Sequence, residues 1–132
     1  MIGHTFKRLK LKNMLTQLST FTIDWKHFSA LCSGDTHIMD EVAKMLIDEI
    51  PTELLALNTA VSQKNWGDVF DICHKLKTTV SFFGNTELNN IVKTMEFSAQ
   101  HNVDTHLIVD LKSHCSDILN RIQGELMQSK NL

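Results

Sequence analysis

Cys73–Gly84 reads CHKLKTTVSFFG, and this stretch decides the fold. Beginning one turn before this stretch, apolar residues recur at spacings of four and three, the period of one helix face: Val69, Cys73, Leu76, Val80 and Phe83. The spacing predicts an amphipathic helix with a buried apolar face. We expect this helix to end at Gly84, because glycine adopts the left-handed conformation of a helix C-terminus without a Cβ penalty.

A polar stripe accompanies the apolar one and consists of His74, Lys77, Thr78 and Ser81. We expect His74 at the edge of the buried face, with Lys77 one turn further along the same side. A neutral imidazole is nucleophilic near pH 7, since its reference pKa is about 6.5. A phosphoryl group attached there would carry charge that Lys77, together with Lys75, offsets. The stripe therefore indicates an anion site, and an ordinary surface histidine is the alternative.

The composition favours one helical domain. The chain has 132 residues, 42% of them hydrophobic, with a single proline and five glycines. A chain so poor in helix breakers favours helices over strands and turns. The net charge of -2 argues against a nucleic-acid-binding protein, which needs a basic excess. No apolar run reaches the roughly 20 residues that span a bilayer, so we expect a cytoplasmic protein without direct membrane contact.

The periodicity extends to four further helices. We expect a short helix from about residue 23 to residue 30 with Thr22 as its N-cap. A long helix follows over 35–63, kinked at Pro51. The central helix covers 65–83, and the last two begin at Asn85 and at about residue 104, with fraying at Gly124. Short connections between four long helices predict an all-α, antiparallel up-down four-helix bundle, with the short helix covering one end.

Each predicted helix has an expected inward face. The short helix and the first half of the long one are expected to bury Trp25, Phe28, Leu31, Ile38, Val42, Met45 and Leu46. The last helix is expected to bury Leu107, Leu111, Cys115, Ile118 or Leu119, Ile122 and Leu126. Cys73 and Cys115 are expected to be small buried hydrophobes. The chain has three widely spaced cysteines and no C-x-x-C motif, which fits reduced thiols in a cytosol.

The ends of the chain are expected to lie outside the bundle. We divide the chain into an N-terminal extension or linker over 1–22, a bundle domain over 23–128 and a tail over 129–132. Residues 6–18 mix apolar residues with lysine and arginine, so the extension could contain an amphipathic helix. Such a basic helix can bind a membrane surface or a partner, and a plain linker is the simpler interpretation.

The motif His74-Lys75-Leu76-Lys77, with Phe83-Gly84 at the right offset, resembles the histidine-containing phosphotransfer (HPt) domain. Similar landmarks extend the resemblance from Ile23 to Met127: Ser33-Gly34-Asp35, Ile50-Pro51, Asn65-Trp66 and Met95-Glu96. One position departs from the family pattern, because the glycine that usually follows the lysine is replaced by Thr78. A larger residue there could narrow the access of a partner to His74.

The resemblance implies a phosphocarrier in a multistep two-component phosphorelay rather than an enzyme that turns over alone. His74 is then the phosphoacceptor, which takes a phosphoryl group from the aspartate of a response-regulator receiver domain and passes it to another receiver. Lys77 and Lys75 supply positive charge, Thr78, Thr79 and Ser81 are candidates for hydrogen bonds near the phosphate, and Gly84 is a structural cap. The chain itself is expected to bind no cofactor, since Mg²⁺ belongs to the receiver. The chain is either free or part of a hybrid sensor histidine kinase.

Other chemistries fit less well. His101, His106 and His114 are the best candidates for a metal site, but no spacing typical of metal ligands completes it. Cys73 and His74 diverge by about 100° on a helix and cannot form a catalytic pair. No acidic residue follows His74 directly, and no ATP-binding half is present, which argues against an autokinase. Two alternatives stay open: a degenerate adaptor that binds a signalling partner without phosphotransfer, and a metal-binding bundle.

Overall fold

The computed structural model describes residues 22–129. These residues form five helices and no strand: α2 Trp25–Leu31, α3 Thr36–Ser62, α4 Trp66–Ser81, α5 Thr86–His101 and α6 His106–Ser129. The all-α prediction is confirmed. Residues 1–21 of the extension predicted over 1–22, with its possible helix over 6–18, lie outside the described residues, as do residues 130–132 of the tail predicted over 129–132.

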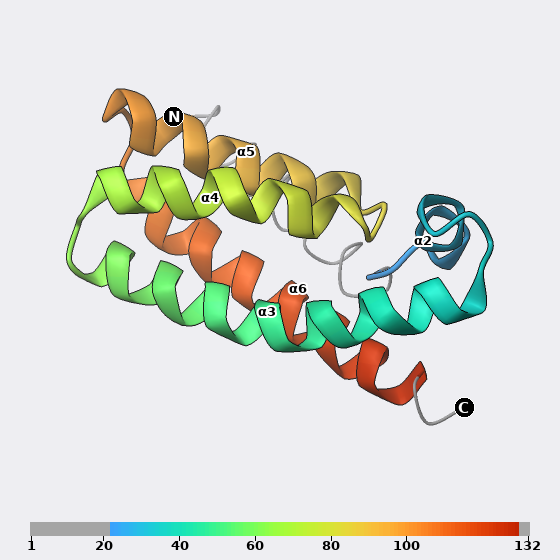
Figure 1. Cartoon of the computed structure of the whole chain (residues 1–132). Coiled ribbons are helices and arrows are strands. Elements are labelled where there is room, and N and C mark those ends of the chain that lie inside the picture. Colours follow the sequence, from blue (N-terminus) through green and yellow to red (C-terminus); the bar gives the residue numbers. More distant parts are fainter. Residues whose placement is uncertain (1–21, 130–132) are drawn as a thin grey trace.

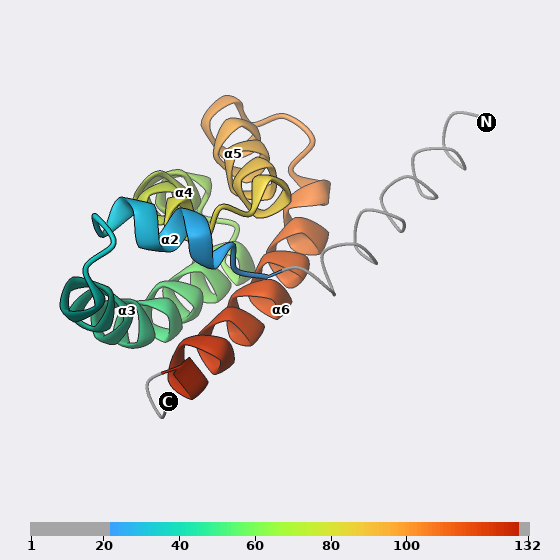
Figure 2. The same cartoon turned by 90° about the vertical axis from the view of Figure 1, so that its right-hand side faces the viewer.

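The four long helices form an antiparallel bundle (Figure 1). Helix α4 packs against α3 and α5, and α6 packs against the same two helices from the other side. Short connections reverse the chain between successive helices, which gives the predicted up-down topology. Helix α2 lies across one end of the bundle and contacts α3 (Figure 2), so the predicted end cap is confirmed as well.

The apolar stripe of α4 is at the centre of the core. All five predicted positions are buried: Val69, Cys73, Leu76, Val80 and Phe83. They pack within one cluster of buried residues to which every described helix contributes. Removing this much apolar surface from water is the main stabilising contribution for a domain of this size. The same stripe fixes the rotation of α4 about its axis, so the polar stripe of His74, Lys77, Thr78 and Ser81 faces outward.

Some predicted inward faces are wrong by one residue. Trp25, Leu31, Ile38, Met45 and Leu107 are exposed. In two cases the buried place belongs to an adjacent apolar residue, Cys32 or Ile108, and of the two neighbours Met45 and Leu46, both predicted to be buried, only Leu46 is. Where two neighbouring residues are both apolar, helical periodicity alone does not decide which of them faces the core, because they differ by only about 100°.

The predicted N-cap of α2 is also wrong. Asp24 caps this helix, accepting a hydrogen bond from the His27 backbone N–H at 3.1 Å. Thr22 is buried instead, and its hydroxyl donates to the Glu125 carboxylate of α6. Thr22 and Ile23 are buried against the bundle, so the helix begins only after them and the side chain of Asp24 takes the capping role. The predicted starts of α3, α4 and α5 agree with the capping side chains of Asp35, Asn65 and Asn85.

The proline and glycine of the long helices leave the helices intact. Helix α3 runs through Pro51 as a single element, as predicted. Helix α6 continues through Gly124 to Ser129, so the predicted fraying at Gly124 is wrong. Leu126, beyond the glycine, is fully buried. Burial of this side chain outweighs the roughly 1 kcal/mol that a glycine costs a helix interior relative to alanine.

Gly84 lies in the turn between α4 and α5, where α2 closes on the bundle. Its φ is 60°, in the left-handed region. The backbone N–H of Asp24 donates to the carbonyl of Phe83 at 2.8 Å, and the ring of His27 contacts the carbonyl of Ser81 at 2.8 Å. A Cβ on Gly84 would lie 2.9 Å from the Cβ of Asp24 and 3.0 Å from that of His27. The turn therefore needs glycine for its conformation and for its space.

A buried carboxyl joins α3 to α4. Glu53 is 5% exposed, and its Oε1 accepts a hydrogen bond from the Thr79 hydroxyl at 3.1 Å. Its Oε2 has no hydrogen-bond partner among the described residues. Burial raises the pKa of Glu53 and Glu49 raises it further, while the Thr79 hydrogen bond and the charge of Lys75 act in the opposite direction.

This carboxyl predicts a pH dependence of stability. The folded state holds the Glu53 proton to higher pH than the unfolded chain, where the ordinary value is 4.5, so its contribution to stability is lost as the pH rises above that value. We expect Glu53→Gln to melt a few degrees higher than wild type at pH 7.5 and at the same temperature at pH 4, measured by circular dichroism. The same difference in melting temperature between Glu53→Gln and wild type at pH 4 and at pH 7.5 would contradict the assignment.

Candidate functional site

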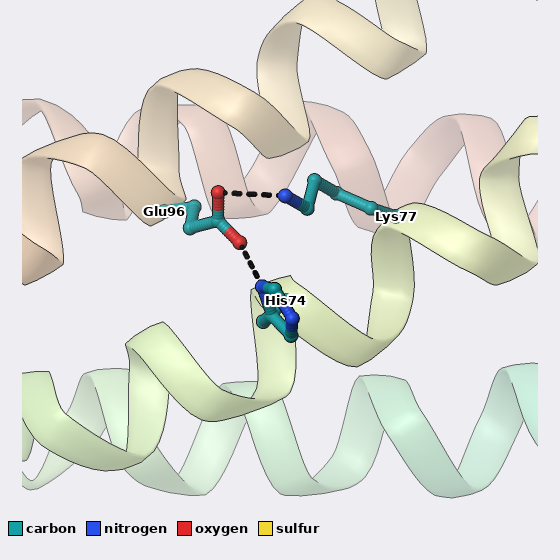
Figure 3. A network of polar contacts seen from close by, with 3 residues as sticks. All are labelled: His74, Lys77 and Glu96. Atoms are coloured by element: carbon teal, nitrogen blue, oxygen red, sulfur yellow. Dashed lines mark hydrogen bonds and ion pairs between the residues drawn. The ribbon is translucent and has the colours of Figure 1, made fainter.

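His74 lies on the outer side of α4 beside the seam with α5 (Figure 3). Its side chain is 67% exposed, although the preceding residue, Cys73, is completely buried. Its ring stacks on that of Phe70, one turn earlier, with centroids 5.9 Å apart and planes 28° apart. The imidazole is therefore held against one helix and stays open to a partner in solution.

Glu96 of α5 joins His74 to Lys77. Its Oε2 lies 2.9 Å from Nδ1 of His74, and its Oε1 lies 3.0 Å from Nζ of Lys77 (Figure 3). The Glu96 side chain is 16% exposed and that of Lys77 is 34% exposed. Both contacts cross from one helix to another, so the packing of α4 against α5 fixes the geometry of all three side chains.

The charge of Glu96 sets the tautomer of His74. Partial burial acts to raise the pKa of Glu96, but the hydrogen bonds from Lys77 and His74 and their charges together lower it. The carboxyl is thus ionised at neutral pH and accepts hydrogen bonds only. A neutral imidazole beside it carries its proton on Nδ1 and donates it to Oε2. The lone pair is then on Nε2, the nitrogen of an exposed ring.

The remaining predicted residues lie at different places on α4. Thr78 and Lys75 are exposed, and the charge of Lys75 acts on Glu53 of α3. The Ser81 hydroxyl donates to the carbonyl of Thr78 at 2.6 Å, within the same helix. Thr79 is buried and donates to Glu53, so the hypothesis that it binds phosphate is wrong. Gly84 lies beyond the end of the helix.

The sequence pattern marks Glu96 as a family landmark and assigns it no role. A signal for that role is nevertheless present. Glu96 directly follows the buried Met95, just as His74 directly follows the buried Cys73. Both residues therefore flank the apolar stripes of two helices that pack together. Pairing those stripes places the two polar side chains on the same seam.

Cys73 does not act as a nucleophile beside His74. Burial, with a contribution from the charge of Glu96, raises the pKa of its thiol to about 12. Burial also raises the pKa of Cys32 and of Cys115, and all three cysteines are free and buried. A thiol rather than a thiolate is present at neutral pH, and it is inaccessible. The chemistry of this part of α4 therefore belongs to the imidazole.

The other candidate histidines do not gather into a site. Within residues 22–129, no group of three or more histidine, cysteine, aspartate or glutamate side chains is arranged to hold a metal ion. His101 lies at the end of α5, and the centroid of its ring is 4.4 Å from that of Phe97. His106 opens α6 and His114 lies two turns further along that helix.

None of the described helices is long and apolar enough to cross a membrane.

Comparison with known proteins identifies the fold and the family. The crystal structure of the HPT domain of a hybrid sensor histidine kinase from Shewanella superposes with a TM-score of 0.74 at 18% sequence identity, over 84% of this chain and 96% of that one. No curated protein sequence matches the chain. The family model of the Hpt domain matches residues 41–125, which contain His74, Lys77 and Glu96. The chain thus belongs to the Hpt domain family and is a phosphotransfer module of two-component signalling.

Proposed function

We propose that His74 accepts a phosphoryl group on Nε2 from the aspartyl phosphate of a receiver domain and then passes it to the aspartate of another receiver. One observation carries this proposal. The ring is 67% exposed while its Nδ1 is tied to Glu96 at 2.9 Å, so the free nitrogen is the accessible one. A nucleophile oriented by a second group is the usual arrangement for covalent transfer.

The proposed step is an in-line displacement. The Nε2 lone pair attacks phosphorus, an N–P bond forms, and the bond from phosphorus to the aspartate oxygen breaks with its electron pair, leaving a carboxylate. Transfer to the next receiver repeats these events in the opposite sense. Mg²⁺ and the acidic residues around it come from the receiver. This chain contributes the nucleophile, a cation and a docking surface, which is the role of a phosphocarrier rather than of an enzyme.

Exposed aromatic side chains near His74 offer a contact surface for a partner that binds only transiently. The imidazole is flanked by Phe70 on its own helix, and Phe97, next to Glu96 on α5, is 58% exposed. We expect a small, transient interface around these residues, in the cytoplasm where receivers work. Because the similar Shewanella domain belongs to a hybrid sensor kinase, the donor receiver in this proposal can be part of the same polypeptide or a separate protein.

A transfer assay tests the proposal. A receiver domain loaded with labelled phosphate is mixed with this chain in Mg²⁺, and label is followed onto the chain. We expect label that is stable in base and labile in acid, as a phosphoramidate is. A chain that binds several phosphorylated receivers and takes no label from any of them is instead the adaptor, with Thr78 in place of the usual glycine as the first suspect.

Lys77 is expected to speed this transfer. In Lys77→Ala, the arriving phosphoryl group loses a nearby cation and meets the Glu96 carboxylate without its compensating charge. We expect the transfer rate to fall roughly ten- to a hundredfold, less than the hundred- to thousandfold loss on removing one donor from a buried oxyanion hole, because the Lys77 side chain is 34% exposed. The measurement is single-turnover transfer from a labelled receiver.

The matched control for Lys77 is Lys75→Ala, which removes an exposed lysine of the same helix whose charge acts on Glu53. We expect this variant to transfer within a fewfold of wild type. Equal rates for both variants and wild type would reduce Lys77 to a surface lysine. Equal losses in both variants would mean that only the total positive charge matters.

A further inference from the structure

A groove of about 590 Å³ lies at the end of the bundle that α2 covers, between α2, the start of α3 and the end of α6 (Figure 2). Its apolar wall consists of Ile23, Trp25, Phe28, Met39 and Ala43. Its polar wall includes the carboxylates of Asp40 and Glu125. A groove of this size has room for several side chains. None of the described residues that line it belongs to α4, so it is separate from the candidate site around His74.

The charge of this groove is negative and uncompensated within residues 22–129. Neither Asp40 nor Glu125 forms an ion pair with a described residue, and no described lysine or arginine lines the groove. The last turn of α6 also lines it and contains no basic residue. A helix C-terminus carries a partial negative charge, so this end of α6 adds to the attraction for a cation. The start of α3 lies at the same groove, but Asp35 already caps it.

The chain supplies a segment of complementary charge that ends at this groove. Residues 1–21 contain four of the 13 lysines and arginines and none of the 15 acidic residues, so the rest of the chain has nine cations against 15 acids. The four cations are Lys7, Arg8, Lys10 and Lys12. The next residue, Thr22, lines the groove, and its hydroxyl donates to Glu125. A segment tethered this closely has an effective concentration of about millimolar at its own groove.

The segment also has apolar residues to match the apolar wall. Leu11, Met14, Leu18 and Phe21 recur at spacings of three, four and three, the period of one helix face. This stripe runs up to the residue before Thr22, and Lys10 and Lys12 lie beside its start. Apolar side chains with cations next to them fit a groove with an apolar wall and two carboxylates.

We propose that residues 1–21 fold back onto this groove, where their apolar residues pack on the apolar wall and their cations pair with Asp40 and Glu125. The Trp25 side chain is 38% exposed, and covering it removes apolar surface from water, which supplies the main favourable free energy of docking. The ion pairs add orientation more than affinity. The docked segment holds α2, α3 and α6 together at this end of the bundle. The inference is independent of the phosphoacceptor role of His74.

The first test is zero-length cross-linking of the full chain. A carbodiimide joins a lysine amine to a carboxylate in contact with it, and mass spectrometry identifies the joined peptides in an equal mixture of ¹⁴N and ¹⁵N chains. We expect links within one chain from the lysines of the segment to Asp40 or Glu125, and few to Asp48, an exposed aspartate of α3 that does not line the groove. Links no more frequent than those to Asp48 would overturn the inference. Links between heavy and light chains would assign the groove to a second copy and overturn it as well.

Thermal unfolding of the full chain gives a second readout. A segment variant changes all four cations of residues 1–21 to glutamine, and a groove variant combines Asp40→Asn with Glu125→Gln. We expect the segment changes to lower Tm by a few degrees in wild type and to leave Tm unchanged in the groove variant, because the interaction is already lost there. Asp48→Asn is the matched control, in which the segment changes should keep their full effect. The same effect of the segment changes in wild type, the groove variant and Asp48→Asn would overturn the inference.

Discussion

His74→Gln is expected to take no label from a phosphorylated receiver and to keep the helical fold. Glutamine has no nucleophilic nitrogen, yet it fits an exposed helix position, and its amide can still donate to Glu96. The side chain is 67% exposed, so the core loses little on substitution. The measurement is label transfer at fixed receiver and Mg²⁺ concentrations, with circular dichroism spectra and melting curves to check the fold.

The control for this variant is the same substitution at another exposed histidine. His37→Gln changes an exposed residue in the first turn of α3, and this variant should accept label at the wild-type rate. Label on His74→Gln would show that the assignment of the phosphoacceptor is wrong. Loss of label in both variants would point to a general effect of the substitution rather than to the site.

Gly84→Ala is expected to destabilise the domain by about 2 kcal/mol or more and to lower Tm by roughly 6–10 °C. The left-handed φ of 60° costs an L-residue about 1–2 kcal/mol. The added Cβ would also lie 2.9 Å from the Cβ of Asp24 and 3.0 Å from the Cβ and Cγ of His27. These atoms belong to the packed start of α2, so the helix itself must shift. Thermal and denaturant unfolding measure the loss.

Gly124→Ala is the matched control for the glycine of the turn. Gly124 lies inside α6 and is exposed, and no atom beyond the backbone of its own helix lies within 4 Å of the place that a Cβ would take. Here alanine should raise stability by about 0.5–1 kcal/mol through its helix propensity. The opposite signs at the two glycines are the expected result. A neutral effect of Gly84→Ala would mean that α2 is not held against the turn as described.

Most of the fold could be predicted from the sequence because the helices are long and their apolar faces are regular. The five buried positions from Val69 to Phe83 all follow from spacing alone. The errors lie where two residues compete for one role. The local pattern favours Leu107 over Ile108 as the buried residue, and Thr22 over Asp24 as the N-cap. Both choices depend on contacts with other helices, which the local pattern does not contain.

Only the part of the candidate site that lies on α4 could be predicted from the sequence. His74 and Lys77 are one turn apart on the same helix, so their spacing brings them together. Glu96 comes from α5, and its contact with both residues depends on how the two helices pack. Thr79 is misplaced for a related reason. Its position next to Thr78 suggests exposure, but it lies three residues after Leu76 and four before Phe83, so it shares their buried face, where its hydroxyl donates to Glu53 of α3.

The most direct test of the proposed phosphotransfer is to locate the phosphoryl group on the ring. A chain labelled with ¹⁵N-histidine is phosphorylated by a loaded receiver, and the nitrogen shifts and the coupling to phosphorus identify the bonded atom. We expect phosphorus on Nε2 of His74 with a proton retained on Nδ1. Phosphorus on Nδ1, or on any other of the seven histidines, would contradict the proposal.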